Sequence, residues 1–235
     1  MWKNNAFRFG ITFLLCLQYS LLRETSYSTI VKPLPVIFWF LIVLFSDKRP
    51  EGKWVLFSLF SAFIGDILLD LGEDWLKIAT IPFLGSTALL ALAFHFRLRN
   101  NITKPVHGKD FLLLLPIATA FILLHLTLAP HLEDAAKIGA VLFTLAVLLL
   151  WRSLAVLLFK NNAEDTNFRR WMGVIGALGI VANYVLYSIN LSVQPIPRDL
   201  VIQVYYWGQA FAAWSFLNHK PFILGRKTEK FQPLK

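Results

Sequence analysis

The stretch FSLFSAFIGDILLDL, residues 57–71, holds two aspartates, Asp66 and Asp70, in a run of otherwise apolar and small residues. Extended back to Trp54, the run has the length and hydrophobicity of a helix that crosses a lipid bilayer. An aspartate at the centre of such a helix costs about 2.5–3.5 kcal/mol even on lenient insertion scales, so each needs a partner, a proton or a wet cavity. We therefore expect function at this pair.

The composition supports a membrane protein. Hydrophobic residues make up 57% of the 235 residues and charged residues only 16%, and the mean hydropathy is +0.58. Soluble domains usually contain about 25% charged residues. The single cysteine, Cys16, lies in the first apolar run, which excludes an intrachain disulfide and a thiolate metal site.

Several segments are long and apolar enough to span a bilayer, and the pieces between them are short, charged and rich in helix breakers. The sequence therefore predicts an all-α polytopic membrane domain of about eight transmembrane helices over residues 1–235, with an uncleaved first helix. The predicted spans are residues 7–22, 30–46, 54–71, 75–96, 111–129, 136–159, 171–190 and 200–217.

The lysines and arginines alternate between the two sides of these spans. One side, which includes both termini, receives 17 of them, and the other receives 4, namely Arg23, Lys77, Lys137 and Arg198. The positive-inside rule then places both termini in the cytoplasm, and we expect the cell (inner) membrane. The net charge of +9 is mostly a topology signal, because the basic residues are scattered and match no nucleic-acid-binding motif. The expected partner is a lipid, not a nucleic acid.

Polar residues of five predicted spans fall in the outer half of the membrane when depth is counted at 1.5 Å per residue. If their faces converge, they form one polar pocket. Each also has a structural reading: a lysine snorkelling at a helix start, an aspartate as a hydrogen-bonding plug, a packed histidine, or tyrosines of an interface belt. These residues are Lys32, Asp66, Asp70, His125, Asn183, Tyr184, Gln203, Tyr206 and Gln209.

Asp66 and Asp70, four residues apart, project from the same helix face. Two nearby carboxylates cannot both ionise cheaply in a low-dielectric site, so one is expected to hold a proton while Lys32 keeps the other ionised. The pair would supply a general acid and a general base, suited either to hydrolysis or to proton coupling. Gly65 leaves space there for a neighbouring helix or a lipid head group.

Several short motifs follow one another along the chain: Val31-Lys32-Pro33-Leu34-Pro35, Phe57-Ser58, Gly65-Asp66-Ile67-Leu68-Leu69, Phe83-Leu84-Gly85, Gly176-Ala177-Leu178, and Tyr205-Tyr206 with Gln209. In this order and spacing, over roughly residues 30–217, the chain resembles the YhhN family of lysoplasmalogenase-like membrane proteins. The resemblance implies an eight-helix membrane protein that hydrolyses the vinyl ether bond of lysoplasmalogens, using an acid and a base and no metal or other cofactor. Asp66, Asp70 and Lys32 are then the candidate catalytic residues, and Tyr184, Asn183, His125, Tyr206 and Gln209 the candidate substrate-binding residues.

The chain also departs from the family pattern. Asn183-Tyr184 stands where the family carries Ser-Asp, and Ala93 stands where it carries a histidine, with His95 two residues on. Either Asp70 has taken over the second carboxylate's role, or the activity has been lost or changed. Two alternatives stay open: a non-catalytic lipid-binding protein of the same family, and a proton-coupled transporter.

A weak internal echo suggests how the site is built. A shift of 118 residues lays Gly65-Asp66 over Asn183-Tyr184 and Asp70 over Ser188. Four helices separate the two segments, so they run in the same direction. This predicts a parallel repeat of two four-helix halves, with the third and seventh spans facing each other across the pocket.

Overall fold

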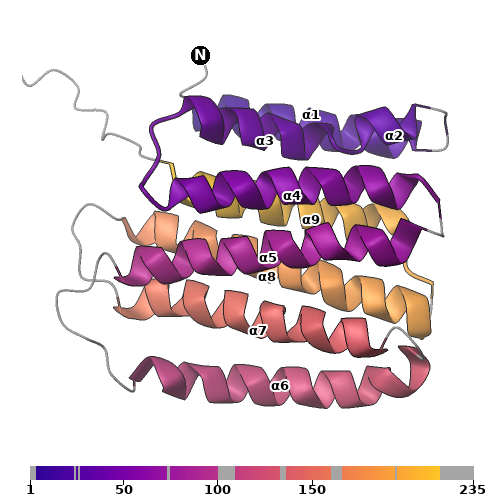
Figure 1. Ribbon diagram of the computed structural model, residues 1–235. Coiled ribbons are helices and arrows are strands. Elements are labelled where there is room, and N and C mark those ends of the chain that lie inside the picture. The colour runs from indigo at the N-terminus through magenta and orange to yellow at the C-terminus, as the bar shows by residue number, and fades with distance from the viewer. Residues whose placement is uncertain are drawn as a thin grey trace, which may run out of the picture.

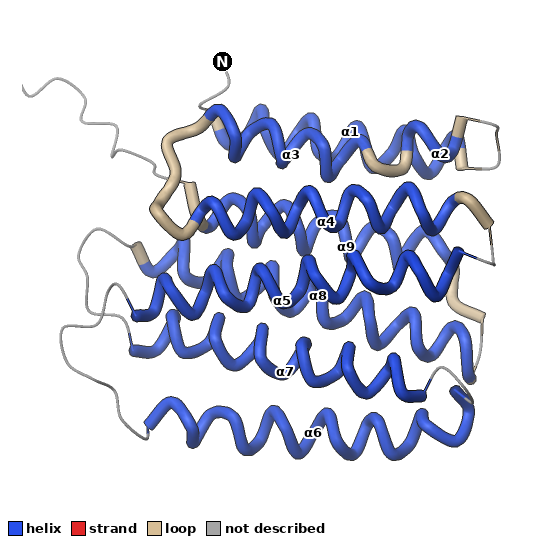
Figure 2. The backbone as a smooth tube through the Cα atoms, viewed as in Figure 1, coloured by secondary structure: helices blue, strands red, loops and turns tan. Residues whose placement is uncertain are grey.

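A computed structural model describes residues 4–23, 25, 27–72, 75–99, 109–132, 136–159, 166–193 and 195–217. These residues are almost entirely helical, and no strand occurs among them (Figure 2). The predicted all-α class is therefore confirmed. The helices are α1 (Asn5–Leu22), α2 (Ser28–Val31), α3 (Leu34–Phe45), α4 (Gly52–Asp70), α5 (Leu76–Arg99), α6 (Lys109–Leu132), α7 (Ala136–Phe159), α8 (Asn167–Ser192) and α9 (Arg198–Ser215).

The long helices lie side by side in one bundle (Figure 1). α1 and α3 form one edge, followed by α4 with α9, then α5 with α8, then α7, and α6 forms the opposite edge. α1 and α9, of 18 residues each, run alongside the longer helices. Six segments among the described residues are long and apolar enough to cross a membrane: Ser28–Phe45, Gly52–Asp70, Lys77–Arg99, Asp110–Pro130, Gly139–Phe159 and Asn167–Asn190.

The second predicted span, residues 30–46, is interrupted instead of continuous. α2 ends at Val31 and α3 begins at Leu34, so Lys32 sits at the junction. Pro33 and Pro35 have no N–H to donate to the carbonyls four residues earlier, which weakens the helix at this point. The Tyr206 hydroxyl of α9 donates a hydrogen bond to the Lys32 carbonyl. The junction therefore turns Lys32 toward the inside of the bundle.

The first described helix, α1, begins at the end of the bundle at which the last described helix, α9, ends. The Trp214 indole donates to Asn5 Oδ1 at 2.9 Å, and the Arg49 amide donates to the Phe216 carbonyl at 3.2 Å. We call this the proximal end. The opposite end, where α1 and α4 finish and α9 begins, is the distal end.

Close packing between α8 and α9 depends on glycines. A Cβ atom at Gly176 would lie 2.3 Å from the Ala212 amide nitrogen, and one at Gly208 would lie 2.7 Å from the Ile180 nitrogen. Small residues at such positions let two helix backbones approach, which is a common way to join helices in lipid. These contacts hold the second half of α9 against α8 along the part of the bundle between its middle and the proximal end.

Candidate active site

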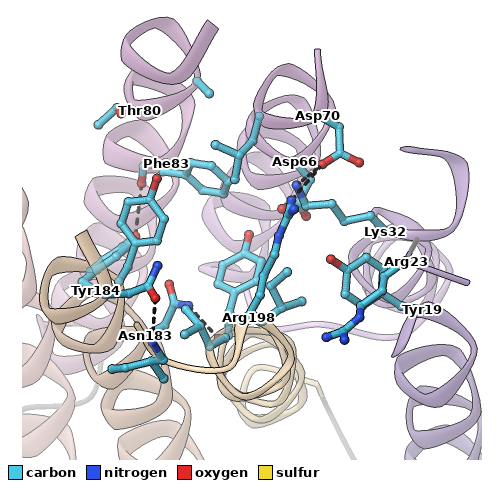
Figure 3. Close-up of a pocket in the computed structure, with 18 of the residues that line it drawn as sticks. Tyr19, Arg23, Lys32, Asp66, Asp70, Thr80, Phe83, Asn183, Tyr184 and Arg198 are labelled. Carbon is cyan, nitrogen blue, oxygen red and sulfur yellow. Dashed lines mark hydrogen bonds and ion pairs between the residues drawn. The ribbon is translucent and has the colours of Figure 1, made fainter. Parts of the chain in front are cut away.

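A cavity of about 870 Å³ opens at the distal end of the bundle. Its wall combines residues from the ends of α1 and α4 and the starts of α5 and α9 with residues of α2, α7 and the distal part of α8. The volume lies within the range of small-ligand sites in proteins. Figure 3 shows charged and aromatic side chains from these helices converging on one space.

Lys32 and Asp70 form the ion pair at the centre of this wall. Lys32 Nζ lies 2.5 Å from Asp70 Oδ1, and both side chains are buried. Arg198 of α9 approaches the same oxygen at 3.5 Å with a largely exposed guanidinium. The prediction that Lys32 contacts Asp66 or Asp70 is confirmed, and the snorkelling reading of Lys32 is wrong, because only 1% of the residue is exposed.

Asp66 lies one helical turn deeper on α4 than Asp70 and also lines the cavity. It is 3% exposed, and its Oδ2 is buried and accepts no hydrogen bond from any described residue. Gly65 makes the close approach of α5 feasible, since a Cβ there would meet the Phe83 ring at 2.9 Å. Of the two occupants expected from the sequence, a neighbouring helix or a lipid head group, it is the neighbouring helix α5 that fills the space left by Gly65.

Asn183 and Tyr184 of α8 line the same cavity. The Asn183 amide donates to the Val201 carbonyl at 2.7 Å, which ties α8 to α9. The Tyr184 hydroxyl hydrogen-bonds with the Thr87 hydroxyl and donates to the Phe83 carbonyl at 3.5 Å. The side chain that replaces the family aspartate thus connects α8 to α5. α4 and α8 both contribute to the cavity, as the repeat hypothesis expected, although the repeat itself stays a prediction.

Three of the candidate binding residues lie away from the cavity wall. Tyr206 and Gln209 are buried on α9, where Tyr206 supports the Lys32 carbonyl, and neither lines the cavity. His125 of α6 packs edge-on against Phe143 of α7, with ring centroids 5.7 Å apart, in a separate small apolar cluster. The three residues are therefore not in position to contact a ligand in this cavity.

The cavity also contains polar residues that the sequence interpretation did not select for the site. The charge count gave a signal for two of them, since it assigned Arg23 and Arg198 to the side of the membrane that is poor in cations, and Tyr205 stood in one of the family motifs. Arg23 pairs with Asp199 at 2.6 Å, next to Arg198 in the sequence. The additional polar lining residues are Tyr19, Arg23, Ser28, Thr80, Tyr187, Asn190, Arg198 and Tyr205.

The assembled site has a consistent chemical character. It places Asp66, a buried carboxyl that forms no ion pair with the described residues, beside Asp70, a carboxylate that a lysine neutralises, within a cavity that also has apolar walls. No curated protein and no solved structure matches the chain. The family model described as the YhhN family matches residues 27–216, a range that contains both aspartates, Lys32 and the whole cavity wall except Tyr19 and Arg23. The chain therefore belongs to the YhhN family.

Proposed function

We propose that this protein is a lysoplasmalogenase-like membrane hydrolase, which cleaves the vinyl ether bond of lysoplasmalogen-type lysophospholipids. The observation that carries the proposal is the position of Asp66. This residue matches the Gly-Asp motif of the family, is buried on the cavity wall and forms no ion pair with a described residue. Family membership supports a lysoplasmalogenase-like membrane protein in general, and the substrate and the reaction are part of the proposal.

The two aspartates are suited to different protonation states. Burial without a cation in contact disfavours the charged form of a carboxyl group, whereas a close ammonium favours it. Asp66 would therefore keep its proton and act as the acid, and Asp70, held by Lys32 at 2.5 Å, would act as the base. Pairs of carboxyl groups whose environments separate them in this way are typical of acid–base enzymes.

The reaction then needs only water besides the substrate. Asp66 gives its proton to the vinyl carbon farther from the ether oxygen, and the double-bond electrons form the new C–H bond. The neighbouring carbon becomes an oxocarbenium ion, which water attacks while Asp70 accepts the released proton and returns it to Asp66. The resulting hemiacetal collapses: its C–O bond to glycerol breaks, the hydroxyl proton moves to the glycerol oxygen, and a fatty aldehyde leaves.

Aldehyde release from purified protein in detergent tests the proposal. We expect release from lysoplasmalogen and none from a 1-acyl lysophospholipid. Asp66→Asn keeps the shape of the side chain but has no proton to deliver, so the rate should fall by a factor of about 100 or more. Asp110→Asn is the matched control, because Asp110 pairs with Arg152 at 3.3 Å outside the cavity. Full activity of Asp66→Asn would show that the acid is another residue.

The replacement of the family aspartate by Tyr184 favours a second candidate, a non-catalytic lipid-binding protein. The Tyr184 hydroxyl is engaged with α5, which is a structural role. Asp70→Asn and Tyr184→Asp separate the two candidates. If Asp70 serves as the second carboxylate, Asp70→Asn should lose nearly as much aldehyde release as Asp66→Asn, and Tyr184→Asp should preserve or raise the rate. A silent wild type combined with an active Tyr184→Asp variant would identify a lapsed enzyme.

A further inference from the structure

We infer that Arg198, assisted by Arg23, forms a phosphate-binding rim at the mouth of the distal cavity, which holds the phosphodiester of a lysophospholipid head group. The inference rests on the proposed function for the identity of the lipid. It goes further by assigning a head-group position and an orientation, with the head group at the distal surface and the hydrocarbon chain inside the bundle. Figure 3 shows Arg198 reaching along the cavity toward Asp70, with Arg23 and Tyr19 beside it.

Arg198 has hydrogen-bonding capacity that its contact with Asp70, within the described part of the chain, does not use. Among the lining residues, the cations are Arg23, Lys32 and Arg198. Lys32 is committed to Asp70 at 2.5 Å, whereas Arg198 reaches the same oxygen only at 3.5 Å and its side chain is 63% exposed. A guanidinium carries five N–H donors in a planar fork that matches the oxygens of a phosphate. Arg198 can therefore bind a phosphate while Lys32 still neutralises Asp70.

Arg23 offers a second cation at the same rim. It pairs with Asp199 at 2.6 Å, and both side chains are about one-third exposed. Ion pairs at exposed positions contribute little to stability, so an incoming phosphate can compete for Arg23 at low cost. The displaced Asp199 then lies next to any ammonium group that the head group carries.

The distribution of charge in the chain supports a specific role for these arginines. The side assigned to the distal end has only four lysines and arginines in the whole sequence, and two of them, Arg23 and Arg198, line the cavity. Lys77, at the start of α5, is exposed and does not line it. Cations are thus kept at the cavity mouth on a side that topology otherwise depletes of them.

The size of the substrate fits this orientation. Asp66 lies four residues before Asp70 on α4, which corresponds to a rise of about 6 Å. In a lysoplasmalogen, the phosphorus and the vinyl ether carbon are about 7 Å apart along an extended glycerol backbone at ordinary bond lengths. A phosphate held beside Asp70 by Arg198 would therefore place the reacting bond near Asp66. Apolar lining residues, including Ala79, Phe83 and Val201, would contact the chain.

Binding of an unreactive analogue tests the rim separately from catalysis. The probe is a 1-alkyl lysophosphatidylethanolamine, which has a saturated ether and cannot follow the vinyl ether reaction, and the comparison ligand is a 1-alkylglycerol with the same chain and no phosphate. The full chain in detergent is titrated calorimetrically with each. Arg198→Gln should weaken binding of the phospholipid roughly tenfold or more and leave the alkylglycerol unchanged. Arg198→Lys should restore part of the loss, and Arg99→Gln, an exposed arginine at the proximal end, should change neither affinity.

The remaining arms decide between sources of phosphate and between roles of Arg198. Inorganic phosphate and glycerophosphoethanolamine should bind far more weakly than the phospholipid, and equal affinities would overturn the lipid assignment. Equal losses of affinity for the phospholipid and the alkylglycerol in Arg198→Gln, or no loss for either, would also overturn it.

Should Arg198→Gln fail to fold, Arg23→Gln must show the same selective weakening of phospholipid binding. If wild type releases no aldehyde but shows this selectivity, the hydrolase proposal fails and the rim stands. If wild type releases aldehyde but Arg198→Gln shows no selective loss of phospholipid binding, the hydrolase proposal stands and the rim fails.

Discussion

At the scale of single residues, Lys32 determines how Asp70 is tolerated inside the bundle. The ion pair is buried on both sides, and removing one partner of such a pair leaves an uncompensated charge. We expect Lys32→Met to destabilise the protein by about 3 kcal/mol, toward the lower end of the usual range because Arg198 remains near Asp70. The midpoint of thermal unfolding in detergent measures the effect.

Two further variants make this prediction specific. Lys53→Met is the matched control, since Lys53 is exposed on α4 and its removal should change stability little. The double variant Lys32→Met/Asp70→Leu removes both charges, so it should be more stable than Lys32→Met alone. A double variant that is less stable than the single one would show that Lys32 contributes through something other than the pairing.

The contact between Lys32 and the aspartates could be predicted because an unpaired charge in lipid is so costly that the few available partners must meet. The placement of His125 could not be predicted in the same way. Counting residues gives the depth of a side chain in the membrane, but the side of the helix that faces the cavity depends on packing between helices. In the structure, the face of α6 that carries His125 packs against Phe143 of α7. Arg198 was missed for a related reason, because its contact with Asp70 joins the start of α9 to the end of α4.

At the scale of helices, the contact between α8 and α9 tests whether the backbone approach holds the cavity together. Gly208→Ala would place a Cβ atom 2.7 Å from the Ile180 nitrogen, and backbone atoms cannot move aside as a flexible side chain can. Overpacking of this kind costs about 1–3 kcal/mol. We therefore expect a lower unfolding temperature for Gly208→Ala and weaker binding of the lipid probe, because the start of α9 carries Arg198.

Gly10→Ala provides the control for this variant. Gly10 lies within α1, and a Cβ there would meet nothing within 4 Å. Replacing a helical glycine by alanine without a clash should leave stability unchanged or raise it by up to about 1 kcal/mol. Equal unfolding temperatures for Gly208→Ala and wild type would contradict the close backbone contact.

The helices themselves were largely predictable from hydrophobic length. The predicted span 136–159 coincides with α7, and the span 54–71 differs from α4 by two residues at its start and one at its end. The interruption at Lys32 was not predicted, because prolines near a helix start are usually tolerated. Here, Pro33 and Pro35 follow Ser28–Val31, which is itself helical. The carbonyls before the prolines lose their donors, and the Tyr206 hydroxyl from a distant helix binds the Lys32 carbonyl.

At the scale of the whole molecule, the bundle has two unlike ends. At the proximal end, Trp214 donates a hydrogen bond to Asn5 and the Arg49 amide donates to the Phe216 carbonyl, while the cavity opens at the distal end. Several arginines are buried near the proximal end, including Arg8, Arg97 and Arg169, and this is the side to which the sequence assigns most basic residues. From the positive-inside rule, we expect the cavity to face away from the cytoplasm.

Reporter fusions test this orientation. A reporter after Lys235 should be cytoplasmic, and one inserted within residues 191–199 should lie on the opposite side, because the last predicted span, residues 200–217, separates the two positions. A third reporter within residues 46–51 should agree with the one after Lys235, since Arg49 contacts Phe216 at the proximal end. If the first two reporters fall on the same side, α9 does not cross the membrane and the depth argument that joins Asp66 to the α9 residues fails. If they fall on opposite sides as expected, Arg23 and Arg198 face the head groups of the outer leaflet, and lysophospholipid would enter the cavity from that leaflet.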